Sequence, residues 1–308
     1  MTNEKAKRIV IFGGSGFIGM NLAKRLDGLG CEVVIVSRNE PEPGPWSFHK
    51  WDGRTLGQWA SVVDGAHTVV NLAGRTVDCI KTPLQCDEIL RSRVEATRVI
   101  GEAVQAATNK PSVWVQMSTA HIYGDSELEC NESAAFGYGL APTVGIAWEK
   151  AFDDTCPDGV RKVVLRTTFV LGQTGAALQK LKLVTKLGLG GTISTGTQGM
   201  SWIHELDMSR IIERAISDPS MVGPYIASSP NPVSNRVFMK SLRKALHMPI
   251  GLPAAAWMIK IGAKFILKTD PELALYGRYC IPQRLIDEGF EFEQPDLGKA
   301  LQELCAKR

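Results

Sequence analysis

Short apolar runs alternate with longer segments of helical periodicity through the first half of the chain. Near-continuous runs of Val, Ile and Leu are typical of strands buried on both faces, as in a parallel sheet with helices on each side. The predicted strands are Arg8–Phe12, Glu32–Ser37, His67–Leu72, Val113–Ser118, Lys162–Thr168 and Tyr225–Ser228. The predicted helices between them include Phe17–Leu26, Gln85–Ala106 and Thr143–Asp153. This pattern predicts a doubly wound α/β fold.

After Gly172 the alternation becomes irregular. A glycine-rich loop at Leu187–Gly199 precedes predicted helices at Glu205–Ile216 and Asn235–Leu246. We therefore expect a nucleotide-binding domain at 1–172 and a smaller C-terminal substrate lobe at 173–308. The lobe should cover the carboxyl edge of the sheet, where ligands bind in such folds, while the segment around 225–228 adds a strand to the main sheet.

One C-terminal segment, 253–268, has lysines at helical spacing on one face and apolar residues on another. The lysines are Lys260, Lys264 and Lys268, and the apolar residues are Ile259, Ala263 and Ile266. We interpret it as an amphipathic helix packed on the protein, and a membrane-surface helix is the alternative.

Composition and charge narrow the classes of function. The chain has 308 residues, 44% of them hydrophobic, and a net charge of +3, too small to imply a nucleic-acid partner. No apolar window approaches the length of a membrane span. The seven cysteines are odd in number and never spaced C-x-x-C, which argues against a disulfide framework or a metal site. A reducing compartment is indicated, and we expect the cytoplasm.

The first strand leads directly into G-G-S-G-F-I-G, in which Gly13, Gly16 and Gly19 form G-x-x-G-x-x-G at the start of a helix. Such a turn lets the backbone approach a pyrophosphate, and the helix N-terminus offers free N–H groups to the phosphates. Because a strand precedes the turn and a second strand follows at the expected distance, we predict a Rossmann-type dinucleotide site. Ser15, Phe17 and Ile18 lie in the same turn.

The end of the second strand indicates which dinucleotide is bound. It reads V-V-I-V-S-R-N, with Ser37 and Arg38 where an NAD-preferring site usually has an acid. An arginine can pair with a 2′-phosphate, so the sequence favours NADP(H). The alternative is that Arg38 is a solvated loop residue and that either cofactor is accepted.

Several motifs in register resemble the extended short-chain dehydrogenases/reductases. Besides the glycine turn they are N-L-A-G (Asn71–Gly74), M-S-T-A-H-I-Y-G (Met117–Gly124) and L-R-T-T-F-V-L-G (Leu165–Gly172). R-S-R-V-E-A-T (Arg91–Thr97), W-I-H-x-x-D (Trp202–Asp207) and the terminal I-P-Q-R-L-I-D-E-G-F (Ile281–Phe290) resemble an atypical branch of that superfamily, the "epimerase family proteins" of bacteria and animals. The branch is NAD-dependent epimerase/dehydratase-like, and the resemblance spans nearly the whole chain.

The resemblance implies roles for individual residues. Arg38 would meet the 2′-phosphate, Asp52 would lie near the adenine, and Ser118 or Thr119 would hydrogen-bond a substrate carbonyl. Trp202, His204 and Asp207 would brace the lobe, although His204 could equally be a structural histidine. The expected cofactor-binding residues are Gly13, Ser15, Gly16, Phe17, Ile18, Gly19, Ser37, Arg38, Asp52, Leu72, Ala73, Gly74, Arg93 and Thr168. Relatives often pair through their two long central helices, which leaves a homodimer open.

The catalytic pair of the superfamily, Y-x-x-x-K, is missing. The tyrosine is the general acid/base, and the lysine four residues on lowers its pKa from near 10. None of the five tyrosines has a lysine four residues later. Taking Glu149 as the acid that often follows the lysine puts Ala141 at the tyrosine position and Gly145 at the lysine position. Neither can transfer a proton.

Two further departures concern the substrate pocket. Arg75 follows N-L-A-G where the branch tends to have an acid, and Thr197 stands where a basic residue is common. The small-molecule substrate is not identified by any residue of the sequence.

Two functions remain open. The first is an oxidoreductase acting on an unknown carbonyl or alcohol with a nonstandard acid, for which Tyr123, His121 and Tyr138 are candidates. In that case a Ser118 or Thr119 hydroxyl with an ordered water could also serve. The second is a non-catalytic NADP(H)-binding redox sensor or regulatory scaffold. Sugar-nucleotide epimerisation is disfavoured, because it needs a proton-handling residue at a position that is blank here.

Overall fold

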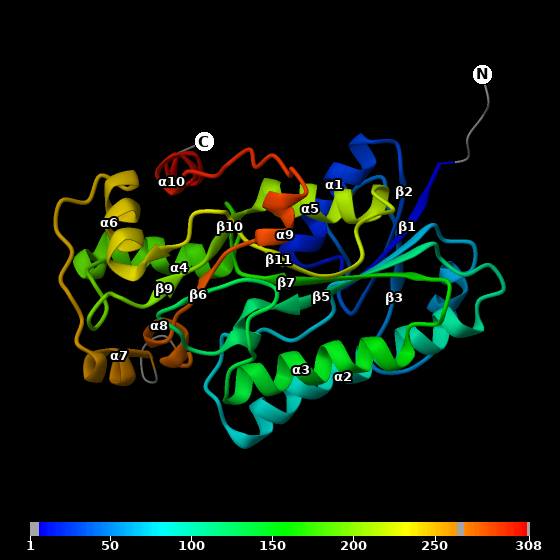
Figure 1. The fold of residues 1–308 in the computed structure, drawn as a ribbon, viewed down its shortest axis with the longest axis horizontal. Helices are drawn as coiled ribbons and strands as arrows, with labels where there is room; N and C mark the ends of the chain where they lie inside the picture. Colours follow the sequence, from blue (N-terminus) through cyan, green and yellow to red (C-terminus); the bar gives the residue numbers. More distant parts are fainter. Residues whose placement is uncertain (1–5, 264–267, 307–308) are drawn as a thin grey trace.

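Seven parallel strands form the central sheet of the computed structural model, which describes residues 6–263 and 268–306. Their order is β11-β7-β5-β4-β1-β2-β3, and every neighbouring pair is parallel. The bounds are β1 Arg8–Phe12, β2 Glu32–Ser37, β3 Ser47–Lys50, β4 Thr68–Asn71, β5 Val113–Thr119, β7 Arg161–Thr167 and β11 Gly223–Ala227. All six predicted strands are present, and the doubly wound α/β fold is confirmed (Figure 1).

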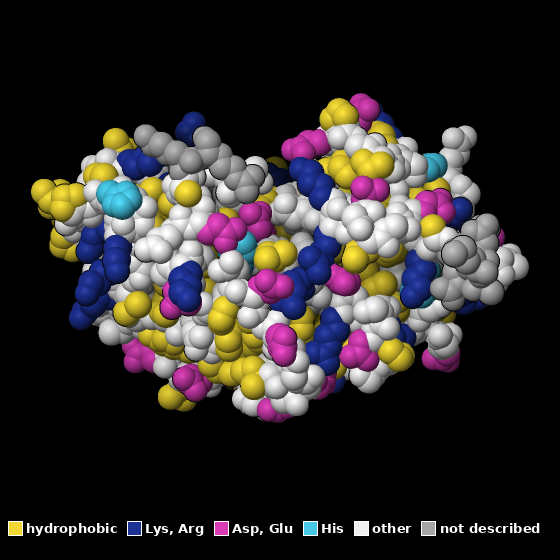
Figure 2. Space-filling model, turned by 90° about the horizontal axis from the view of Figure 1, so that it is seen from above, with side chains coloured by type: hydrophobic (Ala, Val, Ile, Leu, Met, Phe, Trp, Pro, Cys, Tyr) yellow, Lys and Arg dark blue, Asp and Glu magenta, His cyan; other side chains and the backbone are white. Residues whose placement is uncertain are grey.

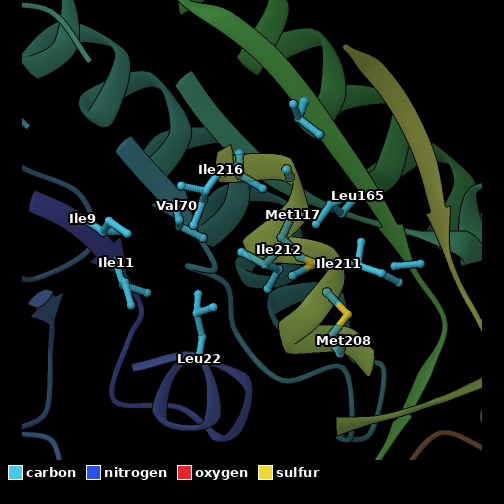
Figure 3. Packing of buried hydrophobic residues seen from close by; sticks show 14 of the residues in the cluster. Ile9, Ile11, Leu22, Val70, Met117, Leu165, Met208, Ile211, Ile212 and Ile216 are labelled. Atoms are coloured by element: carbon cyan, nitrogen blue, oxygen red, sulfur yellow. The ribbon is translucent and has the colours of Figure 1, made fainter. Parts of the chain in front are cut away.

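Helices cover both faces of this sheet. On one face α2 (Pro83–Ala106) lies beside α3 (Leu140–Thr155), and on the other α1 (Phe17–Gly28) lies beside α5 (Glu205–Ser217) (Figure 1). Figure 3 shows α5 directing Met208, Ile211 and Ile212 toward side chains of the strands. Because strand residues alternate between the faces, neighbouring positions such as Ile9 and Val10 belong to different cores.

The predicted strand Lys162–Thr168 is broken in the structure. β7 ends at Thr167, and β8 (Phe169–Leu171) pairs instead with β10 (Trp202–His204) in a separate two-stranded sheet. The break occurs at Thr168, whose N–H (3.2 Å) and Oγ1 (3.0 Å) both donate to the carbonyl of Ala227 at the end of β11. Both donors are satisfied at the sheet edge, and the chain turns away there into the lobe.

Most of the remaining elements gather at the carboxyl edge of the sheet. The helices α4 (Ala176–Val184), α6 (Asn235–Ala245) and α10 (Leu297–Cys305) share a hydrophobic core of their own. The short elements are η1 Gln58–Val63, η2 Ala120–Tyr123, β6 Glu129–Cys130, η3 Thr185–Leu189, β9 Gly199–Met200, β12 Val233–Ser234, α7 Ala256–Gly262, α8 Glu272–Leu275, β13 Tyr279–Cys280 and α9 Gln283–Asp287. A domain boundary at 172 stays a prediction, and α5 and β11, which follow it, pack with the main sheet.

The described part of the predicted amphipathic helix at 253–268 contains α7 (Ala256–Gly262). Its side chains Trp257, Met258 and Ile261 are exposed, and Ala263 just after it is buried. Lys264 and Ile266 lie outside the described residues. Over residues 6–263 and 268–306, every helix is too short or too polar to cross a membrane.

Basic and acidic side chains are intermixed on the face drawn in Figure 2. Lysines and arginines there lie next to aspartates and glutamates, so neither sign of charge forms a continuous field across this view.

Candidate functional site

The glycine turn is built from backbone contacts that exclude side chains at two positions. Gly13 has φ +73°, and a Cβ there would lie 3.0 Å from the backbone of Ala73. A Cβ on Gly19 would lie 2.5 Å from Gly14 Cα, so α1 can approach the turn only because residue 19 is glycine. Gly16 is exposed and its nearest contact would be 3.4 Å, so packing within the chain does not require glycine there. A ligand that approaches the backbone at Gly16 would require it.

The N-terminus of α1 is suited to an anion. Gly16 is its N-cap, no side chain of the described residues caps it, and its first turn contains no acidic residue. Ser15, Phe17 and Ile18 are partly buried around it. The unpaired N–H groups and the positive end of the helix dipole fit a pyrophosphate.

The end of β2 places Ser37 and Arg38 differently. Ser37 is buried, and its Oγ donates to the carbonyl of Asn39 at 2.7 Å, so it shapes the turn. Arg38 is exposed at the same edge. Asp52 is exposed and accepts from the hydroxyl (2.7 Å) and N–H (2.8 Å) of Thr55, and these hydrogen bonds lower the pKa of its carboxyl. Asp52 is thus committed to its own turn.

The loop after β4 is held by the buried amide of Asn71, the first residue of N-L-A-G, to which the sequence analysis assigned no role. Asn71 Oδ1 accepts from the N–H of Ala73 at 3.0 Å, and Asn71 Nδ2 donates to Thr97 Oγ1 (3.1 Å) and Gln116 Oε1 (3.0 Å). The N–H of Leu72 continues the bonding to β1. This network fixes the backbone that meets Gly13, so the two halves of the predicted cofactor site are joined.

Arg93 of α2 lies across the same loop. Its guanidinium carbon would be 3.3 Å from a Cβ on Gly74, and its Nη2 donates to the carbonyl of Arg75 at 2.9 Å. Nη1 donates to Ile89 O at 3.0 Å, and the guanidinium lies 5.0 Å from the centre of the Trp148 ring. Burial lowers the pKa of Arg93 to about 10. Arg93 therefore holds the loop after β4 against α2 and α3.

Ser118 faces a buried ion pair. Its Oγ donates to Glu149 Oε1 at 2.6 Å, and Arg166 grips the same carboxylate through Nε (2.9 Å) and Nη2 (2.8 Å). Arg166 Nη1 also donates to the hydroxyl of Tyr123 (2.9 Å) and the carbonyl of Glu132 (3.1 Å). Burial by itself lowers the pKa of Arg166, but the hydrogen bonds to Glu149 raise it overall, so the arginine stays charged. Burial raises the pKa of Tyr123.

Arg166 and Glu149 were missing from the predicted site. The signal was present, because Arg166 is a charged residue inside the apolar strand V-V-L-R-T. Glu149 served only to locate the catalytic helix. Glu149 accepts the proton of Ser118, and Arg166 donates to the hydroxyl of Tyr123, so both candidates are bonded to this ion pair.

Of the three hydroxyls at the end of β5 and in the turn after it, those of Ser118, Thr119 and Tyr123, only that of Thr119 is on a partly exposed residue. Its side chain is half-buried, and its Oγ1 accepts from the N–H of His121 at 3.1 Å, which leaves its own proton to donate elsewhere. Gly145 lies directly against it: a Cβ there would be 3.3 Å from Thr119 Cγ2 and 3.2 Å from Ile122. Ala141 is in the first turn of α3, partly buried. Gly145, which the alignment puts at the lysine position, thus lies next to the candidate hydroxyl of Thr119.

The other candidates differ in environment. His121 is half-buried, and burial together with Arg278 and Lys81 holds its pKa well below the usual value. It is therefore neutral at neutral pH. Tyr138 is 98% exposed, so its hydroxyl is surrounded by solvent. Thr168 is buried with both donors committed to the end of β11.

The three lobe residues have structural partners. Trp202 is fully buried and donates through Nε1 to Asn231 O at 3.1 Å. His204 caps α5, its Nδ1 accepting from the N–H of Leu206 at 3.2 Å, and burial lowers its pKa. Asp207 is buried and accepts from two backbone N–H groups of the segment before α10, each at 2.9 Å. These contacts are of the bracing kind that the resemblance implied.

Metal ligands do not cluster in the described ranges 6–263 and 268–306: no group of three or more His, Cys, Asp or Glu side chains could hold an ion there.

This parallel sheet, with its glycine turn before α1 and hydroxyls at the end of β5, defines a dinucleotide-binding fold of the short-chain dehydrogenase/reductase type. Residues 9–226 match the "NAD dependent epimerase/dehydratase family", and the chain belongs to that family. Residues 254–304 match a domain of unknown function, DUF1731. The resemblance inferred from the motifs is confirmed.

Relatives match over nearly their whole length. The chain is 32% identical to epimerase family protein YfhF of Bacillus subtilis (strain 168) over 97% of this chain and 98% of the relative. It is 32% identical to epimerase family protein SDR39U1 of Homo sapiens, over 97% and 100%. The crystal structure of human SDR39U1 (isoform 2) with NADPH superposes with a TM-score of 0.85 at 29% identity, covering 97% and 99% of the two chains.

Proposed function

We propose that the chain binds NADP(H) at the glycine turn. Gly13 and Gly19 let the turn and α1 pack closely, Gly16 leaves the backbone open to a pyrophosphate, and the uncapped N-terminus of α1 would receive its charge. Arg38, exposed at the end of β2, would pair with the 2′-phosphate. The similarity to human SDR39U1, solved with NADPH, supports the choice of this dinucleotide.

We further propose an oxidoreductase activity on a carbonyl or alcohol substrate, for which a bound NADP(H) would supply or accept a hydride. Thr119 carries this proposal. Its oxygen already accepts from the N–H of His121, so its proton can be donated to a substrate carbonyl oxygen. That donation would stabilise the negative charge that develops on the oxygen as the carbonyl is reduced.

Proton delivery would come from water near Thr119. Ala141 and Gly145 have no titratable group, and Tyr123 is held by Arg166 with a raised pKa. Ser118 is bonded to Glu149, which Arg166 neutralises. Neutral His121, half-buried beside Thr119, could orient such a water through its ring. A site of this kind would turn over more slowly than one with a tyrosine acid.

The test is NADPH oxidation by the purified chain with a panel of aldehydes and ketones, comparing Thr119→Val with the wild type. We expect Thr119→Val to reduce kcat about 100-fold and to leave NADPH affinity unchanged, because one charge-stabilising donor is lost. Thr143→Val is the matched control, since Thr143 is an exposed threonine on α3. Equal rates in wild type and Thr119→Val would contradict the assignment.

The second candidate, a cofactor-binding sensor without turnover, is favoured by the packing at Gly145. Any side chain at 145 needs Thr119 or Ile122 to shift by a few tenths of an ångström. α3 therefore packs closely on the loop after β5 at the position where a catalytic lysine would stand. A sensor would bind NADPH tightly, oxidise it with none of the carbonyl compounds, and show different proteolysis with NADP⁺ and NADPH. For either candidate function we also propose a cytoplasmic location and a homodimer that forms through α2 and α3.

A further inference from the structure

Two cysteines that are 150 positions apart in the sequence touch in the structure. Cys130 Sγ and Cys280 Sγ are 3.3 Å apart, and both side chains are buried, Cys130 at 7% and Cys280 at 0% exposure. They come from β6 and β13, short parallel strands in which Cys280 is the register partner of Cys130. Neither segment was singled out in the sequence, because strands of two residues have no periodicity.

The backbone geometry suits a disulfide bond. Neighbouring strands lie about 4.8 Å apart, inside the Cα–Cα range of about 4.4–6.8 Å that disulfides span. The sulfurs, now 3.3 Å apart, must approach to about 2.05 Å, a movement of roughly 1 Å that side-chain rotation can supply. Neither strand has to shift its register.

The two thiols are not equivalent. The hydrogen bond from Cys280 lowers the pKa of Cys130, with Arg278 adding to the effect, whereas the same hydrogen bond raises the pKa of Cys280. Cys130 is also the more accessible of the two. Cys130 is therefore the thiol that ionises and reacts first, and Cys280 is the one that resolves the product.

We propose that Cys130 and Cys280 are a modification site at which a small peroxide, such as hydrogen peroxide, forms a reversible disulfide. The Cys130 thiolate attacks one peroxide oxygen, the O–O bond breaks, hydroxide leaves, and Cys130 becomes a sulfenic acid. The Cys280 sulfur then attacks the Cys130 sulfur, the S–O bond breaks, and the second oxygen leaves as water. Two thiols and one peroxide thus give one disulfide and two waters, and a dithiol reductant reverses the change.

The bond would connect the loop after the candidate hydroxyl to the C-terminal segment. The two segments already exchange hydrogen bonds: Ser126 N–H donates to Gly277 O (2.9 Å), and Ile281 N–H donates to Cys130 O (2.8 Å). Glu132, two residues after Cys130, offers its carbonyl to Arg166 beneath the site. Oxidation would add a covalent bond to the hydrogen bonds between these two segments.

A third buried cysteine is a natural control. Cys156 is buried at 6% exposure, and burial raises its pKa to about 12. Among the described residues its sulfur has only a backbone carbonyl as partner, at 4.0 Å. Peroxide should therefore leave Cys156 as a thiol.

The experiment uses the full chain, first reduced, then treated with hydrogen peroxide, denatured, alkylated and mapped by mass spectrometry. We expect loss of the thiols of Cys130 and Cys280, one cross-linked peptide pair containing residues 130 and 280, and full recovery of both thiols with dithiothreitol. Cys130→Ser and Cys280→Ser should each abolish the cross-link, and Cys156→Ser should retain it.

Other outcomes overturn the proposal. The first is that Cys130 and Cys280 are still fully alkylated at a peroxide dose that oxidises the half-buried Cys79 and Cys86. The second is a sulfinic acid on Cys130 without a cross-link. The mapping of the wild-type chain decides the question by itself if a serine variant does not fold. Its result does not depend on whether the chain turns over NADPH.

Discussion

The most consequential single residue in the structure is Arg166, which lies at the centre of the buried polar cluster beneath the site. Its side chain is 6% exposed, and its partner Glu149 is 14% exposed. A buried ion pair contributes little over an apolar pair of the same shape, but removing one partner leaves the other charge without compensation.

Arg166→Met should therefore lower the free energy of unfolding by about 3–5 kcal/mol. The double variant Arg166→Met, Glu149→Leu should recover a large part of that loss, because no charge is then left buried. Urea unfolding of the two single variants and the double variant measures the coupling. Additive effects of the two substitutions would show that the pair is not energetically joined.

His204 makes the stability depend on pH. Burial holds its pKa below the ordinary 6.5, so below about pH 6.5 the unfolded chain takes up a proton that the folded protein does not. The free energy of unfolding is therefore complete above that pH and falls as the pH drops toward the lower folded pKa. His121 contributes in the same direction.

His204→Asn keeps a side-chain acceptor for the N–H of Leu206, since asparagine is a good N-cap. We expect the variant to lose part of the acid sensitivity between about pH 6.5 and 5 while its stability at pH 8 stays close to that of the wild type. Chemical unfolding at a series of pH values measures this.

Among single residues, the sequence predicted correctly those positions at which the backbone conformation allows only one residue type. Gly13 and Gly19 are required by contacts that no side chain could fit, and their spacing predicted them. Glu149 and Arg166 come from α3 and β7, and their pairing depends on how those elements pack. A single charged residue in a strand indicates a buried partner without identifying it. The sequence therefore could not predict that Arg166 pairs with Glu149 and donates to the hydroxyl of Tyr123.

Among the elements, α5 links the main sheet to the end of the chain. Its buried face packs on the strands (Figure 3). From its first turn Asp207 accepts the N–H groups of Glu293 and Gln294, at 2.9 Å each, and an ion pair from Arg210 at 3.0 Å. The irregular segment before α10 is thereby held by one carboxylate.

Asp207→Asn should loosen that segment, because an amide offers one oxygen where the carboxylate offered two. We expect a loss of about 1–3 kcal/mol in the free energy of unfolding. Hydrogen exchange at Glu293 and Gln294 should also accelerate, as measured by NMR or mass spectrometry. Asp287→Asn, at an exposed position on α9, should change neither quantity.

Element prediction succeeded for strands with an apolar run, the edge strand β11 included, and failed for the edge strand β3 and at the break between β7 and β8. β3 (S-F-H-K) has no apolar run, and two of its four residues are exposed. The division between β7 and β8 was missed since R-T-T-F-V-L reads as one continuous strand, and only the bonds from Thr168 to β11 show where it turns. Tertiary contacts, rather than local pattern, determine these elements.

For the whole molecule, the arrangement of the chain sets where a cofactor and a substrate can meet. The chain leaves the sheet after β7, forms much of the lobe, and returns through α5 to β11 (Figure 1). The glycine turn, the loop after β4 and Thr119 all follow carboxyl ends of neighbouring strands. This is the edge at which such sheets bind ligands.

Binding of NADPH should therefore stabilise the molecule as a whole. At 100 times its Kd, NADPH should add about 2.7 kcal/mol to the free energy of unfolding, and NADH at the same concentration should add less. Arg38→Ala should weaken NADPH binding about tenfold and leave NADH binding unchanged, because only the 2′-phosphate contact is lost. Thermal unfolding with each cofactor, and calorimetric titration, measure both effects. Tighter binding of NADH than NADPH by the wild type would contradict the preference.

The contact between Gly145 and Thr119 also limits how the chain could change in future. A lysine at 145 would need Ile122 or the threonine methyl to move by a few tenths of an ångström before it could restore any chemistry. Its tyrosine partner at 141 gains nothing while that lysine is absent. Restoring the Y-x-x-x-K pair would therefore take two substitutions, at 141 and 145, together with a small adjustment of the loop that packs against α3.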